Sequence, residues 1–276
     1  MSTAGGAWKA FDRARSVNCE SVQIFMKSNM QWFGKSPSEA DAARFVKELA
    51  KGDVGTVFGH AGYLINLAGP DGSNLEKSMK SLVQEIELAS MLKVPFLVLH
   101  PGAHLGQGED AGIKRIAQSL DQIFQATKNC PVRIALENTA GQGTYLGHQI
   151  RHLAEIFDHV NQQDRLGICL DTAHFFAAGY DIRKPNGWNS AIDEVENMLG
   201  LNQVLAFHLN DSKSDLDSRV DRHDHTGHGL IGKPAFKHIV NDTRFANTPA
   251  CLETPKSPDM HEDVENLKTL RSLEKI

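Results

Sequence analysis

Six short apolar runs along the chain each end in a side chain that can bind a metal ion. A run of roughly four to eight apolar residues bounded by polar segments is typical of a strand that is buried on both faces. The end residues follow one another at intervals of 40, 37, 34, 37 and 45 residues, close to the length of a strand–helix–loop unit. The runs end at His60, His100, Glu137, Asp171, His208 and Glu253.

Between these runs, apolar residues recur at the spacing of an amphipathic helix. In residues 73–92 one buried stripe is expected from Leu75, Met79, Leu82, Val83, Ile86, Ala89 and Leu92. Strands are predicted at residues 20–26, 54–60, 95–100, 132–137, 166–171, 204–209 and 249–253. Helices are predicted at residues 5–17, 37–50, 73–92, 110–127, 148–160, 189–199, 233–241 and 259–273.

The alternation of strands and helices predicts an α/β fold in which parallel strands bring their C-terminal ends to the same edge of the sheet. The length fits one TIM-type (β/α)8 barrel, formed by residues 1–276 as a single domain. A closed barrel of this type begins with a strand, whereas the first predicted element here is a helix. We therefore expect a barrel that lacks its N-terminal first strand.

The composition is that of an ordinary globular protein, with 41% hydrophobic and 23% charged residues. No apolar stretch approaches the roughly 20 residues that span a bilayer, and residues 1–16 lack the apolar core of a signal peptide. Cys19, Cys130, Cys169 and Cys251 form no CxxC pair. These observations predict a cytoplasmic protein with reduced cysteines and no membrane partner.

The net charge of −5 would by itself argue against a nucleic-acid partner. Bound metal ions change that balance, because their charge adds to the charge of the protein. Three divalent ions would add +6 to the −5 of the chain and bring the sum to about +1. That positive charge would be concentrated where the ions bind.

The strand-end residues are expected to converge on the mouth where a barrel of this type keeps its active site. Imidazole and carboxylate ligands together suit zinc, manganese or iron. One carboxylate can bridge two ions. A pair of ions about 3.5–4 Å apart can activate a water molecule and stabilise the leaving oxygen in phosphoester hydrolysis.

A second group of candidate ligands lies beyond two of the strands. His174 follows Asp171 by three residues, and Asp221 and His223 lie in the long loop after the strand at 204–209. His174, Asp221 and His223 could hold a third ion and leave positions open for water or substrate, as in catalytic sites. The alternative is a solvated loop that is merely rich in histidine. His104 is expected behind the ligands or at the surface, whereas a predicted helix should turn His148, His152 and His159 toward solvent.

Two apolar segments, Met30-Gln31-Trp32-Phe33 and Tyr63-Leu64-Ile65, follow strand ends and should lie at the same mouth. An apolar side chain there could wedge into a stack of bases. The alternative is a hydrophobic lid folded onto the rim of the barrel. The glycine-rich segments 141–143 and 227–229 lack the spacing of a phosphate-binding loop.

Several of these segments resemble the endonuclease IV family of abasic-site nucleases. They are HAGYLINL (60–67), HPGAH (100–104), ENTAGQG (137–143), CLDTAHFFAAGYD (169–181), HLNDSK (208–213), SRVDRH (218–223) and LET (252–254). They occur in the order of the family, and the resemblance runs from Ser2 to the C-terminal helix. It implies a zinc-dependent (β/α)8 hydrolase of base excision repair that cuts DNA 5′ to an abasic site and leaves a 3′-hydroxyl.

The resemblance also implies roles for individual residues. His60, His100 and Glu137 would hold the first zinc, and Glu137 would bridge to a second held by Asp171, His208 and Glu253. His174, Asp221 and His223 would hold the third, with Mn²⁺ as a possible substitute. Glu137, Glu253 and Asp171 would be the carboxylates at the reaction centre. The partner would be double-stranded DNA that contains an abasic site, with no obligate protein partner; the expected DNA contacts are Met30, Gln31, Tyr63, Leu64, Lys213, Arg219 and Arg222.

The chain departs from the family pattern in places. Met30 stands where the family carries arginine, His228 stands where glutamate is familiar, and the family's first strand is absent upstream of Ser2. Two other functions stay open from the sequence. One is a sugar isomerase or epimerase of the xylose-isomerase-like barrel class, which gathers similar ligands around one or two ions. The other is a binder of damaged DNA without turnover.

Overall fold

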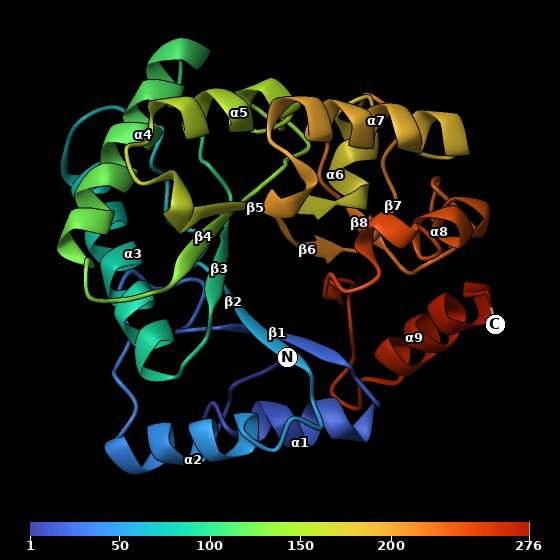
Figure 1. The fold of residues 1–276 in the computed structure, drawn as a ribbon, viewed down its shortest axis with the longest axis horizontal. Coiled ribbons are helices and arrows are strands. Elements are labelled where there is room, and N and C mark those ends of the chain that lie inside the picture. Colours follow the sequence, from blue (N-terminus) through green and yellow to red (C-terminus); the bar gives the residue numbers. More distant parts are fainter. Residues whose placement is uncertain (276) are drawn as a thin grey trace. The chain divides into compact units, whose positions relative to one another are not determined.

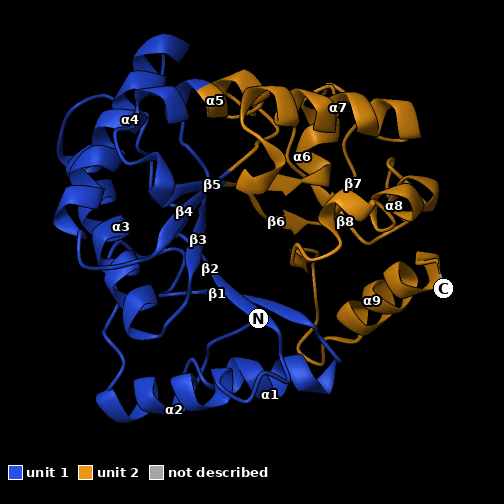
Figure 2. Ribbon diagram, in the orientation of Figure 1, with its two compact units in different colours: residues 1–136, 155–167 blue, residues 137–154, 168–276 orange. Residues whose placement is uncertain are grey.

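The computed structural model describes residues 1–275, which divide into two compact units. Unit 1 comprises residues 1–136 and 155–167, and unit 2 comprises residues 137–154 and 168–276 (Figure 2). The division falls at the end of one strand and inside one helix and another strand. Within residues 1–275, no helix combines the length and the apolar character needed to cross a membrane.

Unit 1 is built from parallel strands with helices between them. Its strands are β1 (Ser21–Phe25), β2 (Thr56–His60), β3 (Phe96–Leu99) and β4 (Arg133–Glu137), and they pair side by side in that order. Its helices are α1 (Lys9–Ser16), α2 (Glu39–Leu49), α3 (Ser73–Met91) and α4 (Glu109–Ala126). Figure 1 shows α1 and α2 together along one side of β1 and β2, whereas α3 and α4 flank β3 and β4.

Unit 2 contains the parallel strands β5 (Leu166–Asp171), β6 (Val204–His208) and β9 (Ala250–Cys251), paired in that order. A short antiparallel ladder joins β7 (Asp211–Ser212) to β8 (His223–Asp224). The helices are α5 (Ile150–His159), α6 (Thr172–Ala177), α7 (Pro185–Met198), α8 (Lys233–Ile239) and α9 (His261–Leu273). Short 3-10 helices occupy Leu201–Gln203 and Thr243–Phe245 in unit 2, and Gln163–Arg165 in unit 1.

In unit 2 the strand registers bring the ends of β5, β6 and β9 close to the same level. In unit 2, Asp171 lies opposite His208, and His208 lies opposite Cys251. A register shift at Ile168 and Cys169 precedes that alignment. Every residue of β3 and of β5 is buried, as expected for strands covered on both faces. The core therefore holds the strand ends in place and leaves the loops that follow them to form a site.

The structure confirms the predicted strands and helices with small shifts at their ends. One helix was not predicted: α6 begins directly after β5, because the Asp171 side chain accepts a hydrogen bond from the His174 backbone N–H at 2.8 Å and caps the helix. The match places the fold in the α/β class. The single-domain organisation stays a prediction.

Two predictions of burial were wrong. His152 was expected in solvent but is fully buried, because its Nδ1 accepts a hydrogen bond from the Gly147 N–H at 3.2 Å. The predicted stripe on α3 was wrong in part: Leu82, Ile86 and Ala89 are buried as expected. Met79 is only partly buried, whereas Ser81 and Glu85, which were not predicted, are fully buried. A carboxylate can replace apolar residues in this stripe because a buried lysine pairs with it.

Candidate metal centre

Four candidate ligands of unit 2 come together at the ends of strands. Glu137 ends β4, Asp171 ends β5, His208 ends β6, and Glu253 follows β9. Each residue contributes one nitrogen or oxygen atom, and the four atoms all lie within 4.8 Å of one another. Glu137, Asp171 and His208 have no exposed surface, and Glu253 is partly buried. The fold thus brings four residues that are far apart in the sequence into one compact group of donors.

The His208 ring lies between the carboxylates of this group. Its Nδ1 is 2.8 Å from Glu137 Oε1 and 3.2 Å from Glu253 Oε2. Burial alone would lower the pKa of His208, but Cys169, Glu253 and Glu137 together raise that pKa well above its usual value. Several buried carboxylates around one imidazole form a negative environment, and a buried charge of this kind requires a cation partner.

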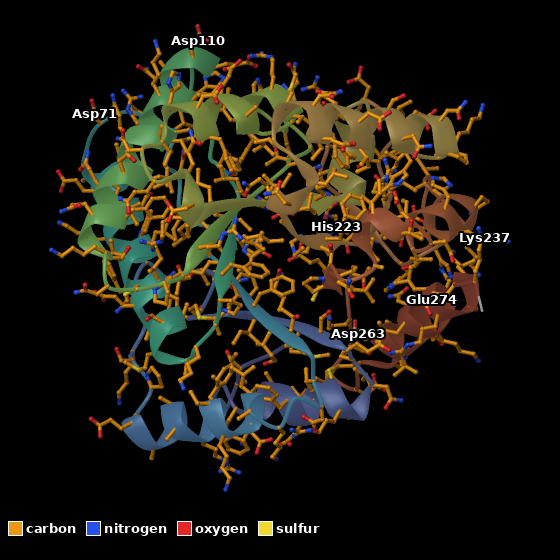
Figure 3. The ribbon with its side chains drawn as sticks, in the orientation of Figure 1. Asp71, Asp110, His223, Lys237, Asp263 and Glu274 are labelled. Atoms are coloured by element: carbon orange, nitrogen blue, oxygen red, sulfur yellow. The ribbon has the colours of Figure 1, made fainter. Side chains whose placement is uncertain are left out.

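A second group of donors shares Asp171 with the first. Asp171, His174 and His223 offer ligand atoms within 4.8 Å of one another. The Asp221 carboxylate lies 3.2 Å from His174 Nε2 and 3.2 Å from His223 Nε2. His174 is supplied by α6, and His223 belongs to β8. Figure 3 shows His223 within unit 2, away from Lys237 and Glu274 at its outer edge.

The charges of the second group are strongly coupled. Burial lowers the pKa of His223, but Asp171 and Asp221 raise it to about 9. Burial also opposes the charged form of His174, yet Asp171, Asp221 and Glu137 raise the pKa of His174 well above its usual value. Although burial would raise the pKa of Asp221, its hydrogen bonds to the two histidines hold that pKa well below its usual range. The second group is therefore suited to holding a cation.

Three histidines share one orientation. The Nδ1 atoms of His60, His174 and His223 face the backbone carbonyls of Ala61, Asn138 and Glu253 at 2.7, 2.8 and 3.2 Å. A carbonyl oxygen only accepts, so each Nδ1 carries a proton and Nε2 is the nitrogen presented to a ligand. Metal-binding histidines use this arrangement, in which the second nitrogen donates to a carbonyl. The donor sets therefore fit a metal ion of the zinc, manganese or iron type.

Two asparagines that the sequence analysis did not single out position Asp171. The Asn210 Nδ2 donates to Asp171 Oδ2 at 2.6 Å, and Asn210 Oδ1 accepts from the Glu253 N–H at 2.7 Å. Asn138 Oδ1 accepts from the Asp171 N–H at 2.6 Å. Each asparagine follows a strand-end ligand by one or two residues, which is the signal that could have identified it.

In unit 1, two further candidate ligands lie side by side. His60 ends β2 and is buried, and His100 follows β3 and is half-buried. Their ring centroids are 5.5 Å apart, with an angle of 71° between the ring planes. The Tyr63 ring packs over this pair, with its centroid 5.6 Å from that of His60. The loop that follows β2 therefore covers the histidine pair.

The residues predicted to contact DNA lie on loops that follow strands. In unit 1 the side chains of Met30 and Tyr63 are 66% and 48% exposed, Gln31 is exposed, and Leu64 is half-buried. Met30 and Tyr63 therefore offer apolar surface to solvent on the loops that follow β1 and β2.

In unit 2, Lys213 and Arg222 are exposed. The Lys213 Nζ lies 3.9 Å from Asp224, and an Arg222 amino group donates to the Asp221 carbonyl at 2.6 Å. The half-buried Arg219 pairs with Asp217 at 3.3 Å. These cations stand on the same loop as Asp221 and His223.

The remaining histidines lie outside both donor groups. His228 is exposed, and His225 contacts Asn266 at 3.0 Å. His104 Nδ1 accepts from the Gly108 N–H at 3.1 Å within its own loop. The segment 223–228 is thus not uniformly solvated, because His223 turns toward Asp221 while His228 faces solvent.

Comparison with known proteins agrees with this geometry. Residues 11–273 match the family described as xylose isomerase-like TIM barrel. A probable endonuclease 4 from Chloroflexus aggregans is 47% identical over 276 residues, covering 100% of this chain and 96% of the relative. One from Geobacter sulfurreducens is 43% identical over 273 residues, covering 99% of this chain and 92% of the relative.

The chain belongs to the endonuclease IV family. The crystal structure of endonuclease IV from Thermus thermophilus matches it with a TM-score of 0.87 and 32% identity, covering 99% of this chain and 96% of that one. A D-tagatose 3-epimerase-like protein matches with a TM-score of 0.68 at 18% identity, a likeness that shows the fold alone. Endonuclease IV membership makes the chain a TIM-barrel nuclease.

Proposed function

We propose that this endonuclease IV-family chain is a metal-dependent phosphodiesterase that cuts DNA 5′ to an abasic site and leaves a 3′-hydroxyl. The observation that carries the proposal is the pair of adjoining donor groups in unit 2 that share Asp171. A single metal ion needs only one such group. Two groups that share a carboxylate support a site with several ions, as phosphodiester hydrolysis uses. The names of the relatives support the choice of a nucleic acid as substrate.

We further propose three zinc ions, with Mn²⁺ as a substitute. Glu137, Asp171, His208 and Glu253 would hold one ion, and His174, Asp221 and His223 would hold another. The His60 and His100 pair would hold the remaining ion. Bound there, the ions would supply an activated water and positive charge beside the phosphate.

The chain's own residues keep the site rigid. Asp171 uses one carboxylate oxygen for the His174 N–H and the other for Asn210. Glu137 lies 2.8 Å from His208 and 3.3 Å from His174, so it adjoins both donor groups. A carboxylate in that position is suited to bridging. Because the groups are buried and hydrogen-bonded before DNA arrives, little reorganisation is needed in the transition state.

The reaction is a hydrolysis in which the bond between phosphorus and the 3′-oxygen breaks. The oxygen of water joins phosphorus, and a proton ends on the departing 3′-oxygen. Tyr63, Leu64 and Gln31 would enter the duplex at the lesion and favour expulsion of the abasic nucleotide, which has no base to unstack. Lys213, Arg219 and Arg222 would contact phosphates, so that binding weakens with salt.

The alternatives receive less support from the structure. A sugar isomerase or epimerase would use one or two ions, whereas His174, Asp221 and His223 provide donors beyond the first group. The structural likeness to epimerases is at low identity and shows the fold alone. A binder without turnover would leave the buried carboxylate group without a chemical role.

The test is a duplex with one tetrahydrofuran abasic-site analogue, incubated with the zinc-loaded protein and resolved on a denaturing gel. We expect one nick 5′ to the analogue, and extension of the product by a DNA polymerase will reveal a 3′-hydroxyl. Chelation should abolish the nick, and zinc or manganese should restore it. An intact duplex is the matched control. Equal cutting of both duplexes, or no cutting by protein of full metal content, would overturn the proposal.

A further inference from the structure

A buried ion pair in unit 1 lies outside both donor groups. The Lys27 Nζ is 2.8 Å from Glu85 Oε1, and their side chains are 2% and 0% exposed. Lys27 follows β1, and Glu85 lies on the inner face of α3. Two charges taken out of water cost more than they recover unless further hydrogen bonds satisfy them. The further hydrogen bonds of the pair therefore show which segments it holds in place.

The other hydrogen bonds of the pair are made to two loops. The Lys27 Nζ donates to the Gln31 carbonyl at 2.7 Å. Both Glu85 oxygens accept from the Gly62 N–H at 3.2 Å. Gln31 and Gly62 are the neighbours of Met30 and Tyr63, the exposed side chains predicted to enter DNA. We call residues 26–34 and 61–65, which carry these side chains, the wedge loops.

The wedge loops are also joined to each other and to α3. The Tyr63 N–H donates to the Asn29 carbonyl at 3.1 Å. The Gln84 side chain accepts from the Gly34 N–H at 2.9 Å and donates to the Gly34 carbonyl at 3.1 Å. Gln84 and Glu85, consecutive on α3, thus hold the first wedge loop near its two ends.

The packing around Gly62 shows how closely the pair approaches the backbone. A Cβ at this position would lie 2.7 Å from Lys27 Nζ and 3.3 Å from Glu85 Oε1. A side chain there would force the Lys27 ammonium to shift, so glycine allows the pair this close approach to the backbone. The ion pair and the glycine together fix the path of the chain into Tyr63.

We propose that Lys27 and Glu85 are positioning residues that hold both wedge loops in the conformation that enters damaged DNA. The inference rests on the proposed function, because it assigns the loops to DNA. Loops that carry function are ordinarily mobile, and ordering them on binding weakens affinity. A buried pair whose hydrogen bonds end on loop backbone removes that cost before DNA arrives.

The test uses the double variant Lys27→Met/Glu85→Leu. Removing one partner alone would leave a buried charge, whereas replacing both by apolar residues is often neutral for stability. We expect an unchanged melting temperature and metal content. We expect the ratio of Kd values for intact and abasic duplex to fall about tenfold, since about 1.4 kcal/mol of ordering cost corresponds to that factor.

The matched control is Arg15→Met/Glu48→Leu. This pair, 2.7 Å apart and also in unit 1, joins the ends of α1 and α2 that precede β1 and β2. The control variant removes one positive and one negative charge near the N-terminal ends of β1 and β2, away from the wedge loops. The ratio of Kd values should therefore not change. A second variant, Gln84→Leu, carries no charge and releases only Gly34, so it tests the loop even if the double variant fails to fold. It should lower the ratio about threefold.

The outcomes separate this inference from the proposed function. If the wild-type protein does not prefer abasic duplex, the proposed function fails. If the wild-type protein prefers it, and the folded double variant and Gln84→Leu keep the full preference, the positioning role is overturned. A fall in the ratio of Kd values with unchanged melting temperature and metal content supports positioning. A merely structural defect would lower the melting temperature as well.

Discussion

His208 presents a different ring nitrogen to the site from the other histidines. Its Nδ1 faces the Glu137 carboxylate at 2.8 Å, whereas His60, His174 and His223 turn Nδ1 toward carbonyls. A ligand held by Glu137 would therefore meet His208 through Nδ1. Which atom of a side chain faces the site therefore differs from residue to residue, so substitutions that change a single atom are the sharpest tests of the site.

Glu137→Gln changes one oxygen of the carboxylate to nitrogen and removes its charge. Glu137 adjoins both donor groups, so we expect turnover to fall by about 100-fold or more while DNA binding stays measurable. Single-turnover nicking and a binding titration will measure the two effects. Glu76→Gln, on the exposed face of α3, is the control and should cut normally. A Glu137→Gln protein that cuts at the wild-type rate would remove Glu137 from the reaction centre.

The raised pKa of His223 predicts how the stability of metal-free protein depends on pH. Its pKa rises from 6.5 to about 9 in the fold. A raised pKa adds stability that is fully present below pH 6.5 and is lost as the pH rises through about 9. The Tm of chelated protein should therefore fall between these pH values. Metal binding displaces the proton, so zinc-loaded protein should not show this fall.

Melting curves of the chelated protein at the two pH values will measure this effect. His223→Gln is the control and should flatten the pH dependence of the chelated protein. A Tm of chelated wild-type protein that rises across this range would contradict the prediction.

At the scale of elements, the loops after β1 and β2 carry the exposed apolar side chains. Tyr63 packs one edge against Phe25, with ring centroids 5.3 Å apart, yet stays 48% exposed. A ring anchored on one side and open on the other is preorganised for stacking. The same strand-to-loop transition thus carries the proposed ligand His60 and, three residues later, the proposed substrate surface of Tyr63.

Tyr63→Ala should weaken the preference for abasic over intact duplex. Loss of one stacking contact costs about 1–3 kcal/mol, or roughly 10- to 100-fold in Kd. Competition binding with the two duplexes measures the preference. Met91→Ala is the control for loss of an exposed apolar side chain, because Met91 is the last residue of α3 and is 48% exposed. An unchanged preference in Tyr63→Ala would return this residue to packing of the rim.

Met30→Arg restores the cation that the family pattern carries at this position. Met30 is 66% exposed, so a longer charged side chain has room to reach a phosphate. We expect tighter binding and a salt slope steeper by about one ion. Kd values across a series of salt concentrations will measure both. Met30→Gln is the uncharged control, and an identical slope for Met30→Arg and wild type would mean that position 30 does not approach the backbone of DNA.

At the scale of the whole molecule, the candidate ligands are distributed over the two units. Unit 2 contains Glu137, Asp171, His174, His208, Asp221, His223 and Glu253, and unit 1 contains His60 and His100. We expect about three zinc ions per folded chain, measured by elemental analysis after dialysis. His60→Ala should remove about one ion, whereas His104→Ala should remove none. One ion or fewer in active wild-type protein would contradict the three-ion proposal.

The local part of this structure was open to prediction from the sequence alone. The apolar runs determined β1 to β6 and β9, because each run carries its own burial pattern. They also determined that polar residues such as His208 and Glu253 stand at the ends of strands. The alternation of strands and helices determined the fold class, since parallel strands need crossover helices.

Only the tertiary structure decided which distant side chains meet. His174 and Asp221 are separated along the chain by α7, β6 and β7, yet their side chains lie 3.2 Å apart. Glu85 occupies a position that the helical pattern did not assign to the core, and it is buried because Lys27 reaches it from another segment. Hydrophobic spacing specifies the inward face of an element and says nothing of its partners. A charged group can be buried only where the folded chain brings a counter-charge and hydrogen bonds to it.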